Sequence, residues 1–173
     1  NEFCKSKNIV LIEDGAQSFG ATQDIGGGQL KKSCSIAPLS CTSFFPSKPL
    51  GAYGDAGAVF TNDDALAKKI RTILNHGQKE RYKHEIIGIN GRLDSIQAAI
   101  LNVKLRHLDD ELAKREKIAQ IYQKSLQNAI LPHIKKGFTS VYAQYSVRVQ
   151  ERSKCIEKLA AKGIPTAIHY PLG

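Results

Sequence analysis

Long apolar runs are missing from this sequence. No stretch approaches the ~20 consecutive apolar residues that a membrane-spanning helix needs, and the first residues lack the basic, apolar and small-residue segments of a signal peptide. We therefore expect a cytoplasmic protein that is not attached to a membrane.

Paired cysteines are missing as well. The four cysteines show neither Cys-x-x-Cys spacing nor the spacing of a disulfide framework, so reduced thiols are expected at Cys4, Cys34, Cys41 and Cys155. We expect no disulfide and no bound metal.

The sequence also lacks nucleic-acid-binding motifs, although its formal net charge is +9. On composition alone, such a surplus attracts nucleic acid, acidic lipid or an acidic small substrate. The Lys and Arg residues are dispersed rather than clustered among aromatic residues, and no helix-turn-helix, zinc-finger or RNP signature is present. Nucleic acid is therefore not an expected partner.

Short apolar and β-rich runs predict strands. Residues 8–13 are typical of a short buried strand, and residues 41–45 and 57–61 predict two more. Residues 21–37 have no periodicity and predict a surface loop or hairpin, in which Gly26–Gly28 is typical of a turn rather than of a phosphate-binding loop. The 173 residues are 42% hydrophobic, which is enough for one core, or for most of one domain and a smaller lobe.

Two capping patterns predict helices. Thr61–Asp64 begins the first helix in the manner of a capping box, and Gly77 ends it. A second capping box at Asp94–Gln97 begins the longest helical pattern, which we expect to bridge two lobes. Its apolar stripe is interpreted as core packing and consists of Leu101, Leu105, Leu108, Leu112, Ile118, Tyr122 and Leu126.

The last third of the chain predicts a strand, a helix and a strand. Residues 141–149 alternate as a strand does, residues 151–161 are helical up to Gly163, and residues 165–169 form a final strand pattern. Together with the earlier elements, these patterns predict an α/β protein.

Lys48 has an unusual local sequence, because it lies between Pro46 and Pro49 directly after an apolar run. Each proline fixes its own φ angle and disfavours helix in the preceding residue, so Ser47 and Lys48 are expected in a short rigid loop. Most lysines are simply solvated, and that interpretation remains open. In a dry pocket, however, a lysine loses proton affinity and becomes a nucleophile that forms Schiff bases with a carbonyl substrate or with pyridoxal phosphate.

Asp14 follows the predicted strand at residues 8–13 and precedes a glycine. Open α/β sheets bind ligands just outside the carboxyl ends of their strands, so Asp14 is a candidate for contact with a charged cofactor group. It is also well placed to cap the Gly15–Ser18 segment. The local sequence leaves both interpretations open.

Several ordered motifs together resemble the DegT/DnrJ/EryC1/StrS sugar aminotransferases, and the resemblance runs along nearly the whole chain. The matching motifs are residues 10–20 with Asp14 and Gln17, the Ser43–Gly51 loop with Lys48, His76-Gly77, residues 88–99, Gly163-Ile164 and His169-Tyr170-Pro171.

The resemblance implies that the cofactor is pyridoxal 5′-phosphate. Lys48 matches the lysine that bonds to the cofactor and transfers protons during catalysis. Asp14 matches the carboxylate that keeps the pyridine nitrogen protonated, and Gln17 belongs to the same cofactor motif. Ser43 matches a hydroxyl that binds the cofactor phosphate. Asn90 matches an asparagine that reaches the cofactor phosphate of the other subunit, which implies a homodimer with shared active sites.

The resemblance also implies the substrates: glutamate as amino donor and a keto group on a nucleotide-linked sugar, for surface-polysaccharide or glycan biosynthesis. The sequences of Ser43–Gly51 and Asn90–Asp94 look most like the branch that aminates a 3-keto uronic acid on uridine diphosphate. Arg92 is suited to bind a carboxylate of glutamate or of the sugar acid. His169 and Tyr170 would alone be interpreted as a structural pair, but the matching family positions lie near the sugar nucleotide.

The implied fold is the C-terminal portion of the fold-type I large domain over residues 1–100, followed by a bridging helix and a small α/β C-terminal domain over residues 101–173. The chain is thus expected to be a C-terminal fragment. It should be inactive alone, because the phosphate-binding helix start and the aromatic that stacks on the cofactor ring would lie upstream.

Two other functions remain possible at this stage. Some relatives are dehydratases with the same cofactor, but one group of them has histidine where this chain has Lys48, so the lysine favours transamination. The chain is also compatible with a non-catalytic binding or regulatory module that keeps the fold.

Overall fold

The computed structural model describes residues 2–172 and has mixed helices and strands. The helices are α1 (Glu2–Ser6), α2 (Asp64–Leu74), α3 (Ser95–Leu105), α4 (Leu108–Ser125) and α5 (Arg152–Ala160). The strands are β1 (Ile12–Asp14), β2 (Thr22–Asp24), β3 (Leu30–Lys32), β4 (Leu39–Ser43), β5 (Gly57–Thr61), β6 (Gln78–Glu80) and β7 (Lys83–His84). No helix within this range has the length and apolarity that crossing a membrane requires.

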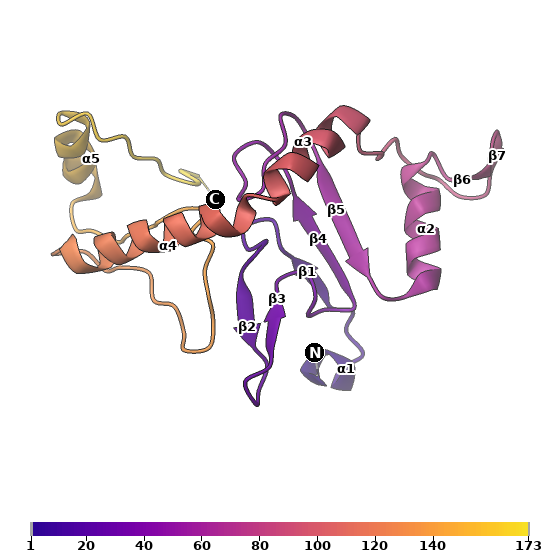
Figure 1. Cartoon of the computed structure of the whole chain (residues 1–173), viewed down its shortest axis with the longest axis horizontal. Helices are drawn as coiled ribbons and strands as arrows, with labels where there is room; N and C mark the ends of the chain where they lie inside the picture. Colours follow the sequence, from indigo (N-terminus) through magenta and orange to yellow (C-terminus); the bar gives the residue numbers. More distant parts are fainter. Residues whose placement is uncertain (1, 173) are drawn as a thin grey trace.

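A three-stranded sheet in the order β1-β4-β5 forms the centre of the molecule (Figure 1). β1 and β4 are parallel, with Asp14 beside Cys41, whereas β4 and β5 are antiparallel, with Ser43 opposite Gly57. Because β1 and β4 run the same way, their carboxyl ends lie at the same edge of the sheet. Asp14 and Ser43, which end these two strands, are therefore placed at one edge, where open α/β sheets bind ligands.

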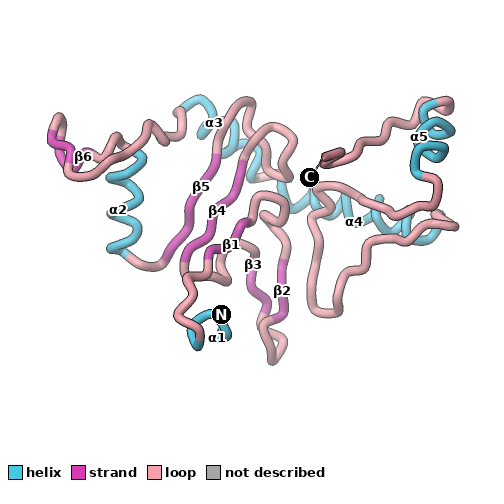
Figure 2. The backbone as a smooth tube through the Cα atoms, turned by 180° about the vertical axis from the view of Figure 1, so that it is seen from behind, coloured by secondary structure: helices cyan, strands magenta, loops and turns pink. Residues whose placement is uncertain are grey.

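The other strands form two hairpins outside this sheet. β2 and β3 pair across the Gly26–Gly28 turn, so the predicted hairpin in residues 21–37 is confirmed. β6 pairs with β7 beyond the end of α2. Figure 2 shows this second hairpin at one end of the molecule, and α5 at the other.

The buried core lies directly beneath the predicted lysine loop. Phe44 and Leu50, on either side of that loop, pack with Ala52, Leu101 and Leu108. Partly buried side chains surround this cluster: Phe19, Ala56, Ala58 and Leu112. Burial of large apolar side chains is worth about 1.5–3 kcal/mol each, so both ends of the loop are anchored by the hydrophobic effect.

The predicted buried strand at residues 8–13 is wrong in two respects. The observed strand is Ile12–Asp14, and Val10 and Ile12 are 82% and 55% exposed. Within residues 2–172 β1 pairs only with β4, which leaves it at an edge of the sheet. The apolar run has the composition of a buried strand, but burial depends on elements that cover it.

The helix at residues 64–74 is confirmed, with Asp63 rather than Thr61 as its N-cap. The Asp63 carboxylate accepts hydrogen bonds from the backbone N–H groups of Ala65 and Leu66 at 2.8 and 3.0 Å. At the other end, the Gly77 N–H donates to the Thr72 carbonyl at 2.8 Å, as in a Schellman motif. The second expected capping box is wrong, because the Asp94 side chain makes no capping hydrogen bond.

The single long helix predicted from residue 95 is also wrong. The chain turns at Arg106–His107, where backbone hydrogen bonds reach back three residues instead of four, and this separates α3 from α4. On either side of this turn Leu101 and Leu108 are buried in the core, while Leu105 stays 50% exposed. No glycine or proline marks this position, so only packing reveals it.

The two strands expected in the C-terminal third are not formed. Residues 141–149 and 165–169 have no ladder partner, apart from one isolated bridge between Ile130 and Arg148. An alternating pattern makes a strand only where a partner supplies backbone hydrogen bonds. The helix predicted between them is confirmed as α5, and Gly163 follows it with a φ angle of 71°.

Gly51 closes the lysine loop where the chain passes the backbone of Pro46. A Cβ atom at position 51 would lie 2.4 Å from the Pro46 carbonyl oxygen and 3.0 Å from that of Phe45. Gly51→Ala must therefore displace the loop, and we expect it to lower the free energy of unfolding by about 2–4 kcal/mol in a denaturant titration. Gly54→Ala is the control, because its Cβ would meet only the flexible end of Gln97 at 3.1 Å. Equal destabilisation by both variants would contradict this prediction.

Candidate active site

Backbone hydrogen bonds hold the lysine loop at both ends. The N–H of Phe44 donates to the Ala56 carbonyl at 2.8 Å, and the N–H of Ala52 donates to the Phe44 carbonyl at 2.7 Å. Within the loop, the Lys48 N–H donates to the Phe45 carbonyl at 2.9 Å. Lys48 itself is half-buried. The expected rigid, proline-framed loop is thus consistent with these contacts.

The Lys48 side chain lies at an open cavity of about 640 Å³, which we call the Lys48 cavity. Its lining residues come from the β1 end, the lysine loop, the turn before β5 and the C-terminal segment: Gln17, Ser43, Phe45, Ser47, Lys48, Asp55, Gln144, Ser146, Ala167, His169 and Tyr170. Five of the residues predicted from sequence meet here, although they span most of the chain. Figure 1 shows the C-terminal segment returning from α5 to the edge where β4 ends.

Asp14 does not line the Lys48 cavity, but begins the turn that carries Gln17. Its Oδ1 accepts a hydrogen bond from the Ala16 N–H at 2.9 Å. This oxygen therefore caps the Gly15–Ser18 segment, as one of the two interpretations of the sequence expected. The other oxygen accepts no hydrogen bond from residues 2–172. The Gly15 N–H donates to the Cys41 carbonyl at 2.7 Å, and the Thr42 hydroxyl donates to the Gly15 carbonyl at 3.1 Å. The backbone directly after Asp14 is therefore fixed through Gly15, while one oxygen of the Asp14 carboxylate remains available.

Glu13 was not singled out from the sequence, yet its carboxylate is the most heavily hydrogen-bonded one in residues 2–172. Burial alone would raise the pKa of Glu13, but hydrogen bonds from the backbone of Cys34 and Ile36 and from the Ser33 hydroxyl hold this pKa below its usual value. Glu13 is therefore ionised at neutral pH. The position of Glu13 next to Asp14 in the sequence gave no indication that its carboxylate would accept these hydrogen bonds.

Asn90 and Arg92 are not brought to the Lys48 cavity. Asn90 forms an isolated backbone bridge with Asn75, just after α2, and the Arg92 guanidinium donates to the Asn75 side-chain oxygen at 3.0 Å. This segment follows the β6–β7 hairpin, which Figure 1 places at the opposite end of the molecule from α5.

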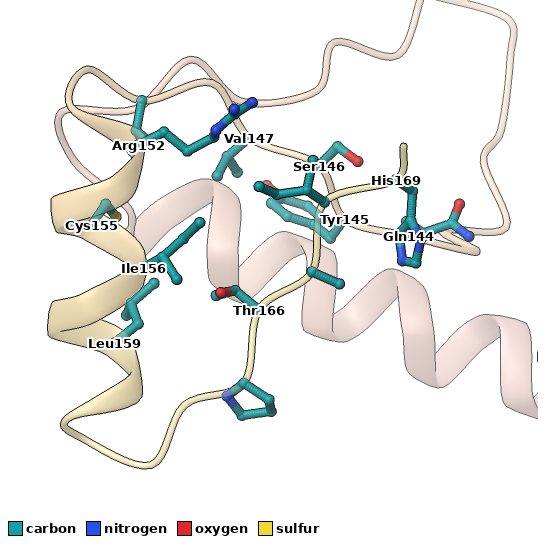
Figure 3. Close-up of a pocket in the computed structure, with 14 residues that line it drawn as sticks. Gln144, Tyr145, Ser146, Val147, Arg152, Cys155, Ile156, Leu159, Thr166 and His169 are labelled. Carbon is teal, nitrogen blue, oxygen red and sulfur yellow. The ribbon is translucent and has the colours of Figure 1, made fainter. Parts of the chain in front are cut away.

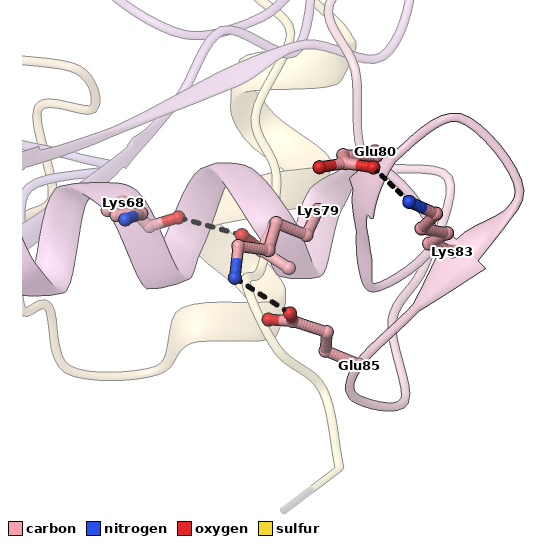
Figure 4. Close-up of polar contacts among 6 residues, drawn as sticks. Lys68, Lys79, Glu80, Lys83 and Glu85 are labelled. Carbon is pink, nitrogen blue, oxygen red and sulfur yellow. Dashed lines mark hydrogen bonds and ion pairs between the residues drawn. The ribbon is translucent and has the colours of Figure 1, made fainter.

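Two ion pairs brace the β6–β7 hairpin (Figure 4). Lys79 lies 3.0 Å from Glu85, and Lys83 lies 2.6 Å from Glu80, with all four side chains more than half exposed. Exposed ion pairs of this kind contribute about 0–1 kcal/mol to the free energy of folding, so these two pairs add little to the stability of the hairpin.

A second cavity of about 440 Å³ adjoins the first along the C-terminal segment. Figure 3 shows it between α5, whose Cys155, Ile156 and Leu159 line it, and the two extended segments that were expected to be strands. It shares Gln144, Ser146, Ala167 and His169 with the Lys48 cavity. The Tyr145 hydroxyl is buried here without a hydrogen-bond partner among residues 2–172.

Sequence reasoning missed several residues that line the Lys48 cavity. Asp55 is its only carboxylate among the described lining residues, and Gln144 and Ser146 approach from the C-terminal segment. Asp55 had a weak signal, since it follows Gly54 just before the start of β5. Gln144 and Ser146 had none, because their approach depends on how the chain returns from α4.

The sequence profile described as the DegT/DnrJ/EryC1/StrS aminotransferase family matches residues 1–173. The chain belongs to this family. A UDP-2-acetamido-2-deoxy-3-oxo-D-glucuronate aminotransferase of Pseudomonas aeruginosa is 49% identical over 174 residues, which cover 99% of this chain and 47% of that protein. The chain therefore spans about half the length of the curated relatives it matches.

Solved structures of family members confirm the predicted fold class. A DegT/DnrJ/EryC1/StrS aminotransferase from Brucella abortus superposes with a TM-score of 0.91 at 40% identity and covers 98% of this chain, which in turn covers 44% of that structure. NtdA from Bacillus subtilis, solved with bound cofactor PMP, gives a TM-score of 0.85 at 27% identity, with coverage of 99% and 40%. The fold is thus part of the fold-type I transferase architecture of this family.

Proposed function

We propose that this protein is a pyridoxal-phosphate-dependent aminotransferase that transfers an amino group from glutamate to a keto group on a nucleotide-linked sugar, for glycan biosynthesis. The observation that carries the proposal is the Lys48 cavity, in which Lys48, Ser43 and Gln17 meet at the carboxyl edge of the sheet. Membership of an aminotransferase family supports it.

The side chains at the Lys48 cavity fit pyridoxal phosphate chemically. A phosphate ester needs hydrogen-bond donors, which the hydroxyls of Ser43 and Ser47 supply, and an aldehyde needs a primary amine, which Lys48 supplies. Gln17 adds an amide, and the available oxygen of Asp14 is suited to a protonated pyridine nitrogen. The bound cofactor PMP in the Bacillus subtilis structure, the pyridoxamine form of the same cofactor, agrees with this assignment.

Lys48 has two tasks in this proposal. Its Nζ would be the attachment point for the cofactor and would accept the proton that leaves Cα of the amino donor. When bound, the cofactor supplies an electron sink that stabilises negative charge at Cα, and Asp14 maintains that sink by holding a proton on the pyridine nitrogen. The backbone hydrogen bonds of the loop fix the Lys48 backbone at the cavity, from which its side chain would reach the cofactor.

The proposed acceptor is a 3-oxo uronic acid linked to uridine diphosphate. The 49% identity to the Pseudomonas aeruginosa aminotransferase supports this choice. His169 and Tyr170 line the Lys48 cavity, which supports the proposal that they contact the sugar nucleotide. Arg92 supplies a planar, bidentate partner for a carboxylate of glutamate or of the sugar acid.

We further propose that the enzyme is a homodimer with shared active sites. Asn90 and Arg92 lie beside α2 and away from the Lys48 cavity of their own chain. In a two-fold dimer, a segment that is far from its own cavity can complete the cavity of the second copy. Asn90 then contacts the cofactor phosphate held by the partner.

The colour of the purified full-length protein, on which all cofactor-binding and activity measurements are made, tests the proposed function. Bound pyridoxal phosphate should give a visible absorption band, and addition of glutamate should bleach it as the amino group is transferred, with release of 2-oxoglutarate. A dehydratase would convert the keto sugar to a product without a new amino group, and a non-catalytic module would have no band. Either result would reject transamination.

A further inference from the structure

A chain of hydrogen bonds runs behind the Asp14–Gln17 segment. Glu13 Oε1 accepts from the Cys34 N–H at 2.7 Å and from the Ser33 hydroxyl at 3.1 Å. Glu13 Oε2 accepts from the Ile36 N–H and from the Ser40 hydroxyl, each at 3.3 Å. Both oxygens of the carboxylate are thus occupied by the loop between β3 and β4 and by β4 itself.

The direction of the next bond in this chain follows from the chemistry of its members. The Ser33 and Ser18 hydroxyl oxygens lie 2.7 Å apart. An ionised carboxylate can only accept, so the single Ser33 proton is donated to Glu13, and Ser18 must be the donor to Ser33. The order is therefore Ser18 to Ser33 to Glu13. Hydrogen bonds aligned in this way polarise one another and are strengthened.

The chain of bonds spans both ends of the segment that carries the cofactor contacts. Glu13 directly precedes Asp14, and Ser18 directly follows Gln17. The middle of the segment has little freedom either, because a Cβ on Gly15 would lie within van der Waals overlap of the Cys34 sulfur. Movement of the loop between β3 and β4 would therefore move Asp14 and Gln17.

We propose that Glu13, Ser33 and Ser18 are positioning residues that hold Asp14 and Gln17 in place for the cofactor ring. The proposal rests on the proposed function, since it assumes that these two side chains face pyridoxal phosphate. None of the three lines the Lys48 cavity, and both Glu13 oxygens and the Ser33 proton are already used in this chain of bonds, so the three residues act through Asp14 and Gln17.

The test uses Ser33→Ala, Ser18→Ala and Glu13→Gln, with Ser35→Ala as the control. Ser35 lies in the same loop, and its hydroxyl donates only to the Lys32 carbonyl, at 2.6 Å. Three quantities are measured: the dissociation constant for pyridoxal phosphate, the position of the visible band of the bound cofactor, and the melting temperature of the cofactor-free protein.

We expect Ser33→Ala and Glu13→Gln to weaken cofactor binding by about tenfold or more and to shift the band, as is common when a residue that orients a ligating side chain is removed. Ser35→Ala should bind with the original affinity. Because Ser18 acts through Ser33, the double variant Ser18→Ala/Ser33→Ala should lose no more affinity than Ser33→Ala alone.

The possible outcomes separate this inference from the proposed function. If the unmodified protein binds no pyridoxal phosphate, both are overturned. If it binds the cofactor, but the variants keep the affinity and band while the melting temperature falls, the three residues are structural only and the inference is wrong. If Glu13→Gln does not fold, the two serine variants decide the question, because they remove one hydroxyl each and leave the carboxylate in place.

Discussion

Lys48→Ala should abolish the visible absorption band of the cofactor-bound protein and lower the rate of amino transfer by a factor of at least about 10²–10⁴. The reason is that Lys48 supplies the primary amine of its cavity, so no other described lining residue can replace it as attachment point and base. Absorbance spectra and the release of 2-oxoglutarate measure the two effects.

Two variants control for charge and for lysine loss in general. Lys48→Arg keeps the positive charge but not the nucleophilic amine, so it should lose the band as completely as Lys48→Ala. Lys68→Ala, on the exposed surface of α2, should change neither quantity.

Borohydride reduction of the unmodified protein should attach the cofactor to the peptide that contains Lys48. Attachment to a different lysine would refute the assignment.

Mixing two inactive variants, Lys48→Ala and Asn90→Ala, should restore activity if the active sites are shared. In a hybrid dimer, the chain with intact Lys48 receives the intact Asn90 of its partner, so one of its two sites is complete. Random exchange of subunits makes about half of the dimers hybrid, so roughly one quarter of the original activity should return.

The matched control mixes Lys48→Ala with Ser43→Ala. Both of these residues line the same cavity of one chain, so each site of the hybrid lacks one of them and no activity should return. Subunit exchange is verified independently with differently tagged chains. If tagged hybrids form and the mixture of Lys48→Ala and Asn90→Ala stays inactive, Asn90 acts within its own chain.

Local signals in the sequence determined the elements that need little from the rest of the chain. The helix at residues 64–74 was predicted from the capping pattern at Thr61–Asp64 and a glycine end, although its N-cap is Asp63, and the strand at residues 57–61 was predicted with its observed bounds. Pro46 and Pro49 predicted the rigid loop that carries Lys48, because each proline restricts its own backbone and that of its neighbour. The order of these motifs was also sufficient to predict the family.

Tertiary packing decided the elements for which the local signal was incomplete. Residues 141–149 and 165–169 alternate like strands, but no backbone partner is available along their length, so they stay extended beside α5. The long apolar stripe after residue 95 is divided at Arg106–His107, and of its leucines Leu101 and Leu108 are buried in the core while Leu105 is exposed. The sequence pattern shows which side chains are apolar, but it does not show which other elements will pack against them.

The site shows the same division. The sequence predicted Lys48 as a candidate from its local context, and the family motifs predicted Ser43, Gln17, His169 and Tyr170. Only the tertiary structure brought these residues to one cavity, added Asp55 to it, placed Asn90 and Arg92 elsewhere, and surrounded the Glu13 carboxylate with donors. Convergence of residues more than one hundred positions apart depends on long-range packing, which no local stretch of sequence encodes.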